Sequence, residues 1–566
     1  MEDVPEQAHL LPAAVDYRAT HSPDTVFAVL PKGDKLEDGF FDLTYAALAN
    51  AVNALAWWLD EVLGTIPATE KFKDFPTVPY IGADDFRYVL LVLAAMKTGR
   101  KAMFSFPANT PEGLARLLEL SQSKITLASA CHKHIWSKPL ADKPEIRTIE
   151  VPCVDTFVHD RPVEPYAYDR TYEEGTTGTP KPIVWSNRWI EEYIGNVAVL
   201  SRHAPADQKS AVYALCEGTR VPNLLPLSWG AGILLALQVP LFAHTVPVML
   251  PPTSIPNPPT ADFIKAIGTY APKGPRNGMI LVPDMLRHLV REAAGRESLQ
   301  QNEWIAYVGA PLDHATGDAL TALGIRVQSM IGATDIGLYN ILLNDPQDWK
   351  IHRFPAALHN YYLDRFADGL YELCTARMPN DPRHVFASAP ELDVYRTRDL
   401  WRAVPGREGY WSNAGRVDDF VKLASMTKFN AIAIEQIVEA SPAVAKCLVA
   451  GDLRLASFIL VEPAPGVGPY DATPDSEVIE RVWPAIAAAN EHLLPEARLS
   501  KELTVITLPG KPIIRTSKGT VQRRASLEIY EKKIEAAYAA AGYAKVPFTI
   551  WGEAVGDVGK VNGHAR

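Results

Sequence analysis

The sequence predicts an α/β fold in two parts: a large N-terminal domain of layered α/β subdomains and a small C-terminal α+β domain. The chain has 566 residues, which is longer than one hydrophobic core usually extends. Short apolar strand patterns alternate with helix patterns up to about residue 340, and this alternation favours layers with largely parallel strands. From about residue 400 the chain becomes polar, and short strands and helices follow.

The first elements follow clear hydrophobic patterns. Residues 42–64 carry Leu and Val at helical spacing, which predicts an amphipathic helix. Residues 78–81 predict a short apolar strand, and residues 88–96 predict an apolar helix. The most apolar stretch, 230–250, contains polar residues and prolines, so we expect buried strand and helix there rather than a membrane span.

The change in composition suggests where the domains meet. We place the boundary at Asp418, so that residues 1–417 form the core and residues 418–530 form the small domain. Residues 526–541 are charged and rich in alanine, which predicts a helix. Residues 531–566 are then expected to form a helical and flexible tail.

Composition excludes several classes of protein. The net charge of -10 argues against a nucleic-acid-binding surface, which needs a basic stripe. The 5 cysteines lie far apart and form no CxxC pair, so neither a zinc site nor a disulfide framework is expected. The acidic start of the chain lacks the pattern of a signal peptide. We therefore expect a cytoplasmic protein that binds neither nucleic acid nor membrane.

A Gly/Thr-rich segment at residues 172–182 is the strongest local signal. Glycines let backbone N–H groups face a phosphate, hydroxyls donate hydrogen bonds, and a lysine adds positive charge. The alternative is a Gly/Thr hairpin turn between two strands. The candidate phosphate-binding residues are Gly175, Thr176, Thr177, Gly178, Thr179 and Lys181.

This segment resembles the phosphate loop of the adenylate-forming superfamily, which contains acyl-CoA synthetases, luciferases and the adenylation domains of nonribosomal peptide synthetases. The resemblance extends over about residues 20–530, and it is closest to fungal synthetase-like adenylation domains, including those of carboxylic acid reductases. Further motifs follow in the family's order: 307–312 (GGAPL-like), 331–335 (YGxTE-like), 395–400 (YxTGDL-like), 415–422 (GRxDxxVK-like) and 515–523, the lysine motif.

The resemblance implies that ATP and Mg²⁺ activate a carboxylic acid as an acyl-AMP, and that the small domain is mobile around a hinge at Asp418. Thr334 and Lys518 would be catalytic, with Lys518 bridging the carboxylate and the α-phosphate, and Asp335 would hold Mg²⁺. Asp399 would accept hydrogen bonds from the ribose hydroxyls. Besides the phosphate loop, the residues expected to bind ATP or AMP are Gly309, Ala310, Ile331, Gly332, Ala333, Thr334, Asp399 and Arg416.

Simpler structural roles remain open for several of these residues. Thr334 and Asp335 are residue types that also begin helices as N-caps. Lys518 lies in a basic segment and could be a solvated charge, and Arg416 could be a solvated charge near a linker.

The acyl pocket is expected around Trp229, Gly309 and Ile336. In relatives that activate amino acids, an aspartate in the corresponding segment pairs with the substrate ammonium. Residues 225–232 contain no acidic residue, so an aryl or other non-α-amino acid is the expected substrate. The alternative for Trp229 is ordinary core packing.

Some positions depart from the family pattern. Glu173 and Glu174 precede the phosphate loop, Ile331 replaces a tyrosine, and Arg398 replaces the glycine of YxTGDL. These departures support an alternative function, a catalytically impaired nucleotide-binding homologue that acts as an interaction partner. The sequence has no LGxDS carrier motif and no GxGxxG fingerprint. We therefore expect the acyl group to pass to CoA or to the phosphopantetheine of a separate carrier protein.

Overall fold

The computed structural model describes residues 10–66, 75–168, 185–190, 196–256, 258–355, 361–367, 369–381, 383–425, 427–467, 474–515 and 521–543. The chain divides into two compact units. Unit 1 comprises Met1–Tyr362, Cys374–Tyr395 and Gly406–Tyr410, and unit 2 comprises Leu363–Leu373, Arg396–Pro405 and Trp411–Arg566. Unit 2 thus includes segments that precede Asp418, and the domain boundaries expected from the sequence remain predictions.

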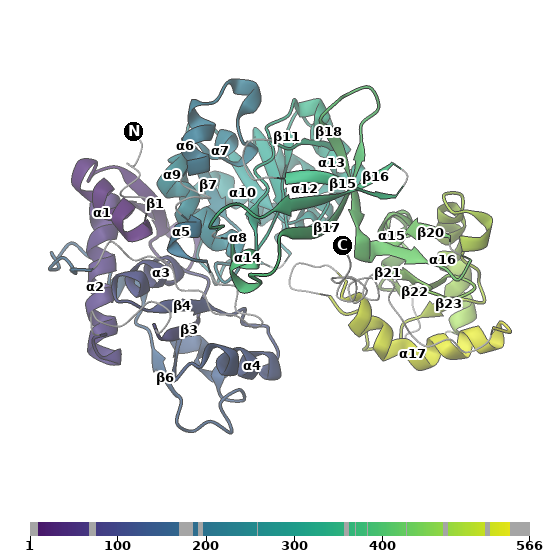
Figure 1. Ribbon diagram of the computed structural model, residues 1–566, viewed down its shortest axis with the longest axis horizontal. Helices are drawn as coiled ribbons and strands as arrows, with labels where there is room; N and C mark the ends of the chain where they lie inside the picture. Colours follow the sequence, from purple (N-terminus) through teal and green to yellow (C-terminus); the bar gives the residue numbers. More distant parts are fainter. Residues whose placement is uncertain are drawn as a thin grey trace. The chain divides into compact units, whose positions relative to one another are not determined.

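One sheet of unit 1 is parallel throughout (Figure 1), with the strand order β4-β3-β5-β6. Its strands are β3 (Thr77–Ile81), β4 (Lys101–Phe104), β5 (Ile125–Ala128) and β6 (Arg147–Glu150). Helix α3 (Arg87–Lys97) links β3 to β4, and α4 (Pro111–Ser121) links β4 to β5. The strand predicted at 78–81 and the helix predicted at 88–96 are confirmed.

Two further sheets of unit 1 are also mostly parallel. The first has the order β2-β1-β8-β7, in which only the pair β1–β2 is antiparallel, and the second has the order β11-β10-β9. Burial on both faces explains the apolar runs of such strands, and every residue of β9 is buried. The strands are β1 (Val26–Pro31), β2 (Phe40–Thr44), β7 (Arg220–Asn223), β8 (Val246–Met249), β9 (Gly278–Leu281), β10 (Trp304–Val308) and β11 (Arg326–Met330).

Helices pack around these sheets. The predicted amphipathic helix is α2 (Tyr45–Leu63), which begins where the Thr44 hydroxyl accepts a hydrogen bond from the N–H of Ala47 at 3.2 Å. Further helices of this unit are α1 (Leu11–His21), α5 (Asn187–Ile190), α6 (Asn196–His203), α7 (Ala211–Cys216), α10 (Ala261–Tyr270), α11 (Pro283–Arg291), α12 (Ala293–Leu299), α13 (His314–Ala322) and α14 (His384–Ser388).

The apolar stretch 230–250 is folded as helix and strand, as predicted. It contains α8 (Gly230–Ile233), a π-helical turn (Leu234–Gln238), α9 (Val239–Ala243) and then β8. Within the described part of the chain, no helix has the length and apolar character needed to cross a bilayer. The cytoplasmic location remains a prediction.

A five-stranded sheet has the order β14-β18-β17-β16-β15. The sequence boundaries between the two units fall within its strands β15, β16, β17 and β18. Its strands β17 and β18 are antiparallel and form the pair that carries Asp399 and Arg416. The five strands are β14 (Ile351–Arg353), β15 (Tyr361–Ala367), β16 (Leu370–Ala376), β17 (Val394–Ala403) and β18 (Tyr410–Arg416).

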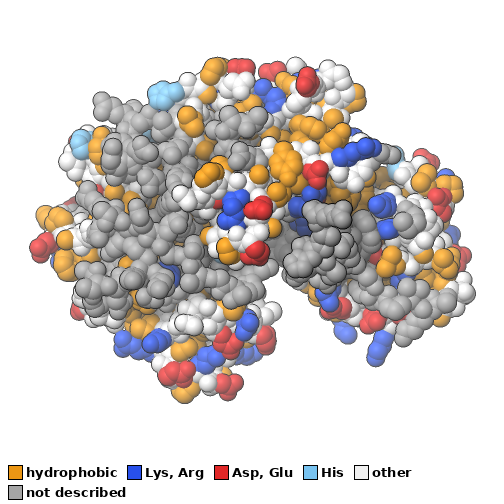
Figure 2. Space-filling view, in the orientation of Figure 1, with side chains coloured by type: hydrophobic (Ala, Val, Ile, Leu, Met, Phe, Trp, Pro, Cys, Tyr) orange, Lys and Arg blue, Asp and Glu red, His pale blue; other side chains and the backbone are white. Residues whose placement is uncertain are grey.

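The rest of unit 2 is an α+β arrangement. Strand β22 pairs antiparallel with β21 and parallel with β23, while β19 and β20 form a separate hairpin. The helix predicted at 526–541 is confirmed as α17. The elements are β19 (Phe420–Lys422), β20 (Lys428–Asn430), α15 (Ala431–Glu439), β21 (Val444–Ala450), β22 (Phe458–Pro463), α16 (Asp475–Asn490), β23 (Thr504–Ile506) and α17 (Arg523–Ala540). On the face drawn in Figure 2, basic and acidic side chains of the described residues are interspersed.

Candidate active site

Two predicted nucleotide-binding segments leave the same edge of one sheet. Strands β10 and β11 are parallel, and their last residues, Val308 and Met330, lie opposite each other. The segments that begin at Gly309 and Ile331 therefore start side by side. In open α/β sheets, ligands bind outside the carboxyl ends of parallel strands.

Thr334 and Asp335 lie in the turn of a short hairpin. Strand β12 (Gly332–Ala333) pairs with β13 (Gly337–Leu338), and Ala333 lies opposite Gly337. The φ angle of Gly337 is +83°, which suits a three-residue hairpin loop that closes on a left-handed glycine. The helix N-cap alternative is therefore wrong for this pair. Thr334 is exposed, whereas Ile336 is fully buried.

The Asp335 side chain is hydrogen-bonded through one of its oxygens. The Tyr395 hydroxyl donates to Oδ2 at 2.9 Å. Among the described residues, no hydrogen bond to Oδ1 is present. Burial lowers the pKa of the nearby His384, although the negative charge of Asp335 opposes this shift. A carboxylate with one oxygen available fits Mg²⁺, which usually takes one or two carboxylates together with substrate phosphates.

An aromatic side chain adjoins this turn. The indole N–H of Trp185 donates to the Thr334 carbonyl at 2.8 Å. A Cβ atom at Gly230 would lie 3.0 Å from Trp185 Cζ2 and 3.4 Å from Thr334 Cγ2, so this position suits glycine. The ring centroids of Trp229 and Phe106 are 6.0 Å apart. Trp229 is half-buried and packs against the hydrophobic core of unit 1. The structure is therefore compatible with both expected roles of Trp229, lining the acyl pocket and packing in the core.

Asp84 is a half-buried carboxylate that the sequence did not predict. Its Oδ1 accepts a hydrogen bond from the N–H of Leu227 at 2.5 Å, which ties the end of β3 to the segment that carries Trp229. Burial, followed by the neighbouring charge of Asp85, raises the pKa of Asp84 to about 6. Its position three residues after an apolar strand was the available signal.

Unit 2 brings Asp399 and Arg416 together. Arg416 Nη1 lies 2.8 Å from Asp399 Oδ1, and the exposed fractions of these side chains are 47% and 14%. Arg416 is therefore half-exposed but paired rather than an isolated solvated charge. Arg398 directly precedes Asp399 and occupies the position of the glycine in the family's YxTGDL motif. Its φ angle is +64°.

The remaining predicted residues are only partly described. Residues 175–181 and Lys518 lie outside the described residues, and Asp418 lies in a 3-10 turn (Val417–Asp419). The arginines that flank the Lys518 segment are paired: Arg515 with Glu462 at 2.8 Å, and Arg523 with the buried Glu435 at 2.7 Å. The functions assigned to these residues remain predictions.

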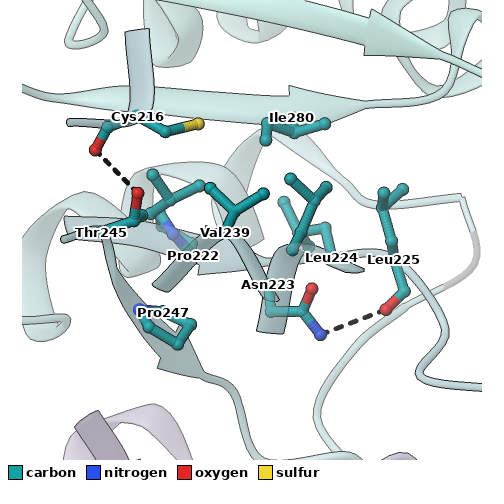
Figure 3. A pocket seen from close by; sticks show the side chains of 11 residues that line it. Cys216, Pro222, Asn223, Leu224, Leu225, Val239, Thr245, Pro247 and Ile280 are labelled. Carbon is teal, nitrogen blue, oxygen red and sulfur yellow. Dashed lines mark hydrogen bonds between the residues drawn. The ribbon is translucent and has the colours of Figure 1, made fainter. Parts of the chain in front are cut away.

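A separate apolar cavity is too small for a substrate (Figure 3). Its volume of about 10 Å³ holds at most one water molecule. Hydrogen bonds at its wall join Thr245 Oγ1 to the Cys216 carbonyl at 2.9 Å and Asn223 Nδ2 to the Leu225 carbonyl at 3.1 Å. Burial raises the pKa of the Cys216 thiol to about 12, so this thiol stays protonated.

Two curated proteins are similar to nearly the whole chain. A carboxylic acid reductase of Neurospora crassa is 26% identical over 95% of this chain and 51% of its own length. An adenylate-forming reductase of Serpula lacrymans var. lacrymans is 25% identical over 94% of this chain and 49% of its own length. The chain thus spans about half the length of these curated relatives.

The fold is shared with solved structures as well. The anthranilate CoA ligase AuaEII in complex with anthranoyl-AMP matches with a TM-score of 0.64 and 15% identity, over 95% of this chain and 99% of that protein. The profile of the AMP-binding enzyme family matches residues 15–357, and that of the AMP-binding enzyme C-terminal domain matches residues 418–542. The chain therefore belongs to the family of AMP-binding enzymes.

Proposed function

We propose that this chain uses ATP and Mg²⁺ to activate a carboxylic acid as an acyl-AMP, with release of pyrophosphate. The observation that carries the proposal is the Thr334–Asp335 turn, which lies at the carboxyl edge of β10 and β11 and adjoins Gly230 and Trp185. A polar turn suited to a nucleotide and an aromatic wall suited to an acyl group thus meet in unit 1.

The reaction brings two anions together, because a carboxylate oxygen must attack the α-phosphorus of ATP. Bound Mg²⁺ would supply positive charge that neutralises the phosphates. Asp335 would hold that ion through the oxygen that Tyr395 does not occupy. The exposed Thr334 hydroxyl would donate to the α-phosphate. Asp399, Arg416 and Lys518 keep the roles expected from the sequence: binding of ribose, binding of nucleotide, and bridging of the reacting groups.

The substrate is proposed to be an aryl or other non-α-amino acid. The expected pocket is bordered by the aromatic side chains of Trp229, Phe106 and Trp185. The Asp84 carboxylate contacts segment 225–232 through the backbone, because the N–H of Leu227 donates to its Oδ1. The similarly folded AuaEII holds an aryl adenylate, anthranoyl-AMP. The acyl group would then pass to CoA or to a carrier phosphopantetheine.

Pyrophosphate release against a panel of carboxylic acids tests this proposal. Aryl acids are expected to give turnover that requires both ATP and Mg²⁺, and α-amino acids are expected to give little. Preferred turnover of α-amino acids would overturn the substrate class, and no turnover with any acid would overturn the activity.

The alternative is a catalytically impaired nucleotide-binding homologue that serves as an interaction partner. The acidic pair Glu173–Glu174 favours it, because carboxylates repel a triphosphate. Membership of an enzyme family and similarity to reductases do not favour it. ATP binding without turnover of any acid would distinguish this alternative from the proposed enzyme.

A further inference from the structure

Asp335 is held by a segment that lies much later in the chain. The N–H of Val385, in α14, donates to the Asp335 carbonyl at 3.3 Å. The hydroxyl of Tyr395, at the start of β17, donates to Asp335 Oδ2 at 2.9 Å. The backbone and one carboxylate oxygen of Asp335 are therefore both fixed by the region between β16 and the first residues of β17.

Two arginines hold this region in place, the buried Arg383 and the half-buried Arg377. The side chains of Arg383 and Asp381 form an ion pair with no exposed surface. Arg383 also donates to the Thr375 hydroxyl at 2.5 Å and to the Ala376 carbonyl at 2.9 Å. Arg377 donates to the carbonyls of Phe386 and Ala389, near the end of α14, at 3.2 Å and 2.8 Å. The donors that reach Asp335 thus come from a firmly anchored part of unit 1.

The length of the Asp335 side chain makes its orientation important. Asp335 lies where the YGxTE motif has glutamate, so its carboxylate is one methylene closer to the backbone. A carboxylate that binds a metal through one oxygen usually accepts a hydrogen bond through the other, and loss of such a partner weakens metal binding by about 10–100-fold. Tyr395 supplies this hydrogen bond to Oδ2, and Oδ1 is left for the metal.

We propose that Tyr395 is a positioning residue, whose hydroxyl holds the Asp335 carboxylate so that Oδ1 can bind Mg²⁺. This inference rests on the proposed function, since it takes Asp335 as the metal-binding residue. Tyr395 itself does not contact the reacting atoms in this account. It acts through Asp335, and removal of its hydroxyl should weaken metal binding without unfolding unit 1.

Mn²⁺ binding to the full chain tests this inference without turnover. Free Mn²⁺ is measured by electron paramagnetic resonance in the presence of α,β-methylene-ATP, whose scissile α,β bond cannot be cleaved. Tyr395→Phe is expected to raise the dissociation constant of Mn²⁺ about tenfold. The matched control is Tyr270→Phe, which removes the hydroxyl of an exposed tyrosine at the end of α10 and should leave Mn²⁺ binding unchanged.

A double-mutant cycle distinguishes positioning from a general structural effect. In an Asp335→Asn background, Tyr395→Phe should have little further effect on Mn²⁺ binding, because the carboxylate that it orients is gone. Unchanged Mn²⁺ binding in Tyr395→Phe, or an equal loss in the Asp335→Asn background, would overturn the inference. If the wild-type chain binds Mn²⁺ with the analogue but releases no pyrophosphate with any acid, the proposed function fails while the role of Tyr395 is still decided by the binding data.

Discussion

Arg398 has a left-handed backbone conformation that favours glycine, with a φ angle of +64°. Its backbone is held by its own N–H, which donates to Glu372 Oε1 at 3.0 Å, and by the N–H of Asp399, which donates to Thr397 Oγ1 at 3.1 Å. Neither hydrogen bond uses the Arg398 side chain. Replacing Arg398 with glycine should therefore keep the conformation and remove its steric cost.

The expected gain follows from two opposing terms. A residue with a Cβ atom in the left-handed region costs about 1–2 kcal/mol. Glycine loses more backbone entropy on folding than a residue with a Cβ atom. This loss opposes folding by about 0.5–1 kcal/mol and so offsets part of the relieved steric cost. The free energy of unfolding of unit 2 is therefore expected to be about 0.5–1 kcal/mol higher in Arg398→Gly than in Arg398→Ala, which corresponds to about 1–4 °C in melting temperature for a unit of this size.

Differential scanning calorimetry of the full chain measures this change, with Arg398→Ala as the matched control. The alanine variant also loses the side-chain interactions of Arg398 but keeps the Cβ atom, so the difference between the two variants isolates the backbone effect. A glycine variant that is no more stable than the alanine variant would refute the reasoning.

Further predictions concern the site in unit 1. Asp381→Ala should lower the free energy of unfolding by about 3–5 kcal/mol in urea titrations, because it removes the carboxylate that neutralises the buried Arg383, and an unchanged midpoint would contradict this. Gly230→Ala should raise the KM for the acid several-fold in steady-state assays, because the added Cβ would lie 3.0 Å from Trp185, and an unchanged KM would show that the pocket lies elsewhere. Partial burial raises the pKa of Asp84 to about 6, so ionisation of this carboxyl group costs stability as pH rises from about 4 through 6. The melting temperature of Asp84→Asn relative to wild type should therefore increase over that range and then level off, and a pH-independent difference would contradict the burial argument.

Local patterns predicted much of the fold. Helix α2 follows from the spacing of its apolar residues and from its N-cap, Thr44. The mostly parallel sheets follow from the alternation of strand and helix patterns. The antiparallel pair β1–β2 is an exception, because it is a hairpin and needs no crossover helix.

The site was less predictable, because its geometry depends on contacts between distant segments. Thr334 and Asp335 are compatible with a helix N-cap by residue type, and only the pairing of β12 with β13 places them in a hairpin turn. The hydrogen bond between Tyr395 and Asp335 joins residues 60 positions apart, which no local pattern can reveal. The sequence showed that Arg398 replaces a glycine, but an arginine gives no sign that the left-handed conformation is retained.

The central claim is that this chain forms acyl adenylates, and mass-spectrometric detection of acyl-AMP tests it most directly. The full chain is incubated with ATP, Mg²⁺ and an aryl acid, in parallel with the Lys518→Ala variant. The wild-type chain is expected to form the acyl-AMP of the acid supplied, and the variant is expected to form far less. Absence of acyl-AMP with every acid tested, or equal formation by the variant, would contradict the account.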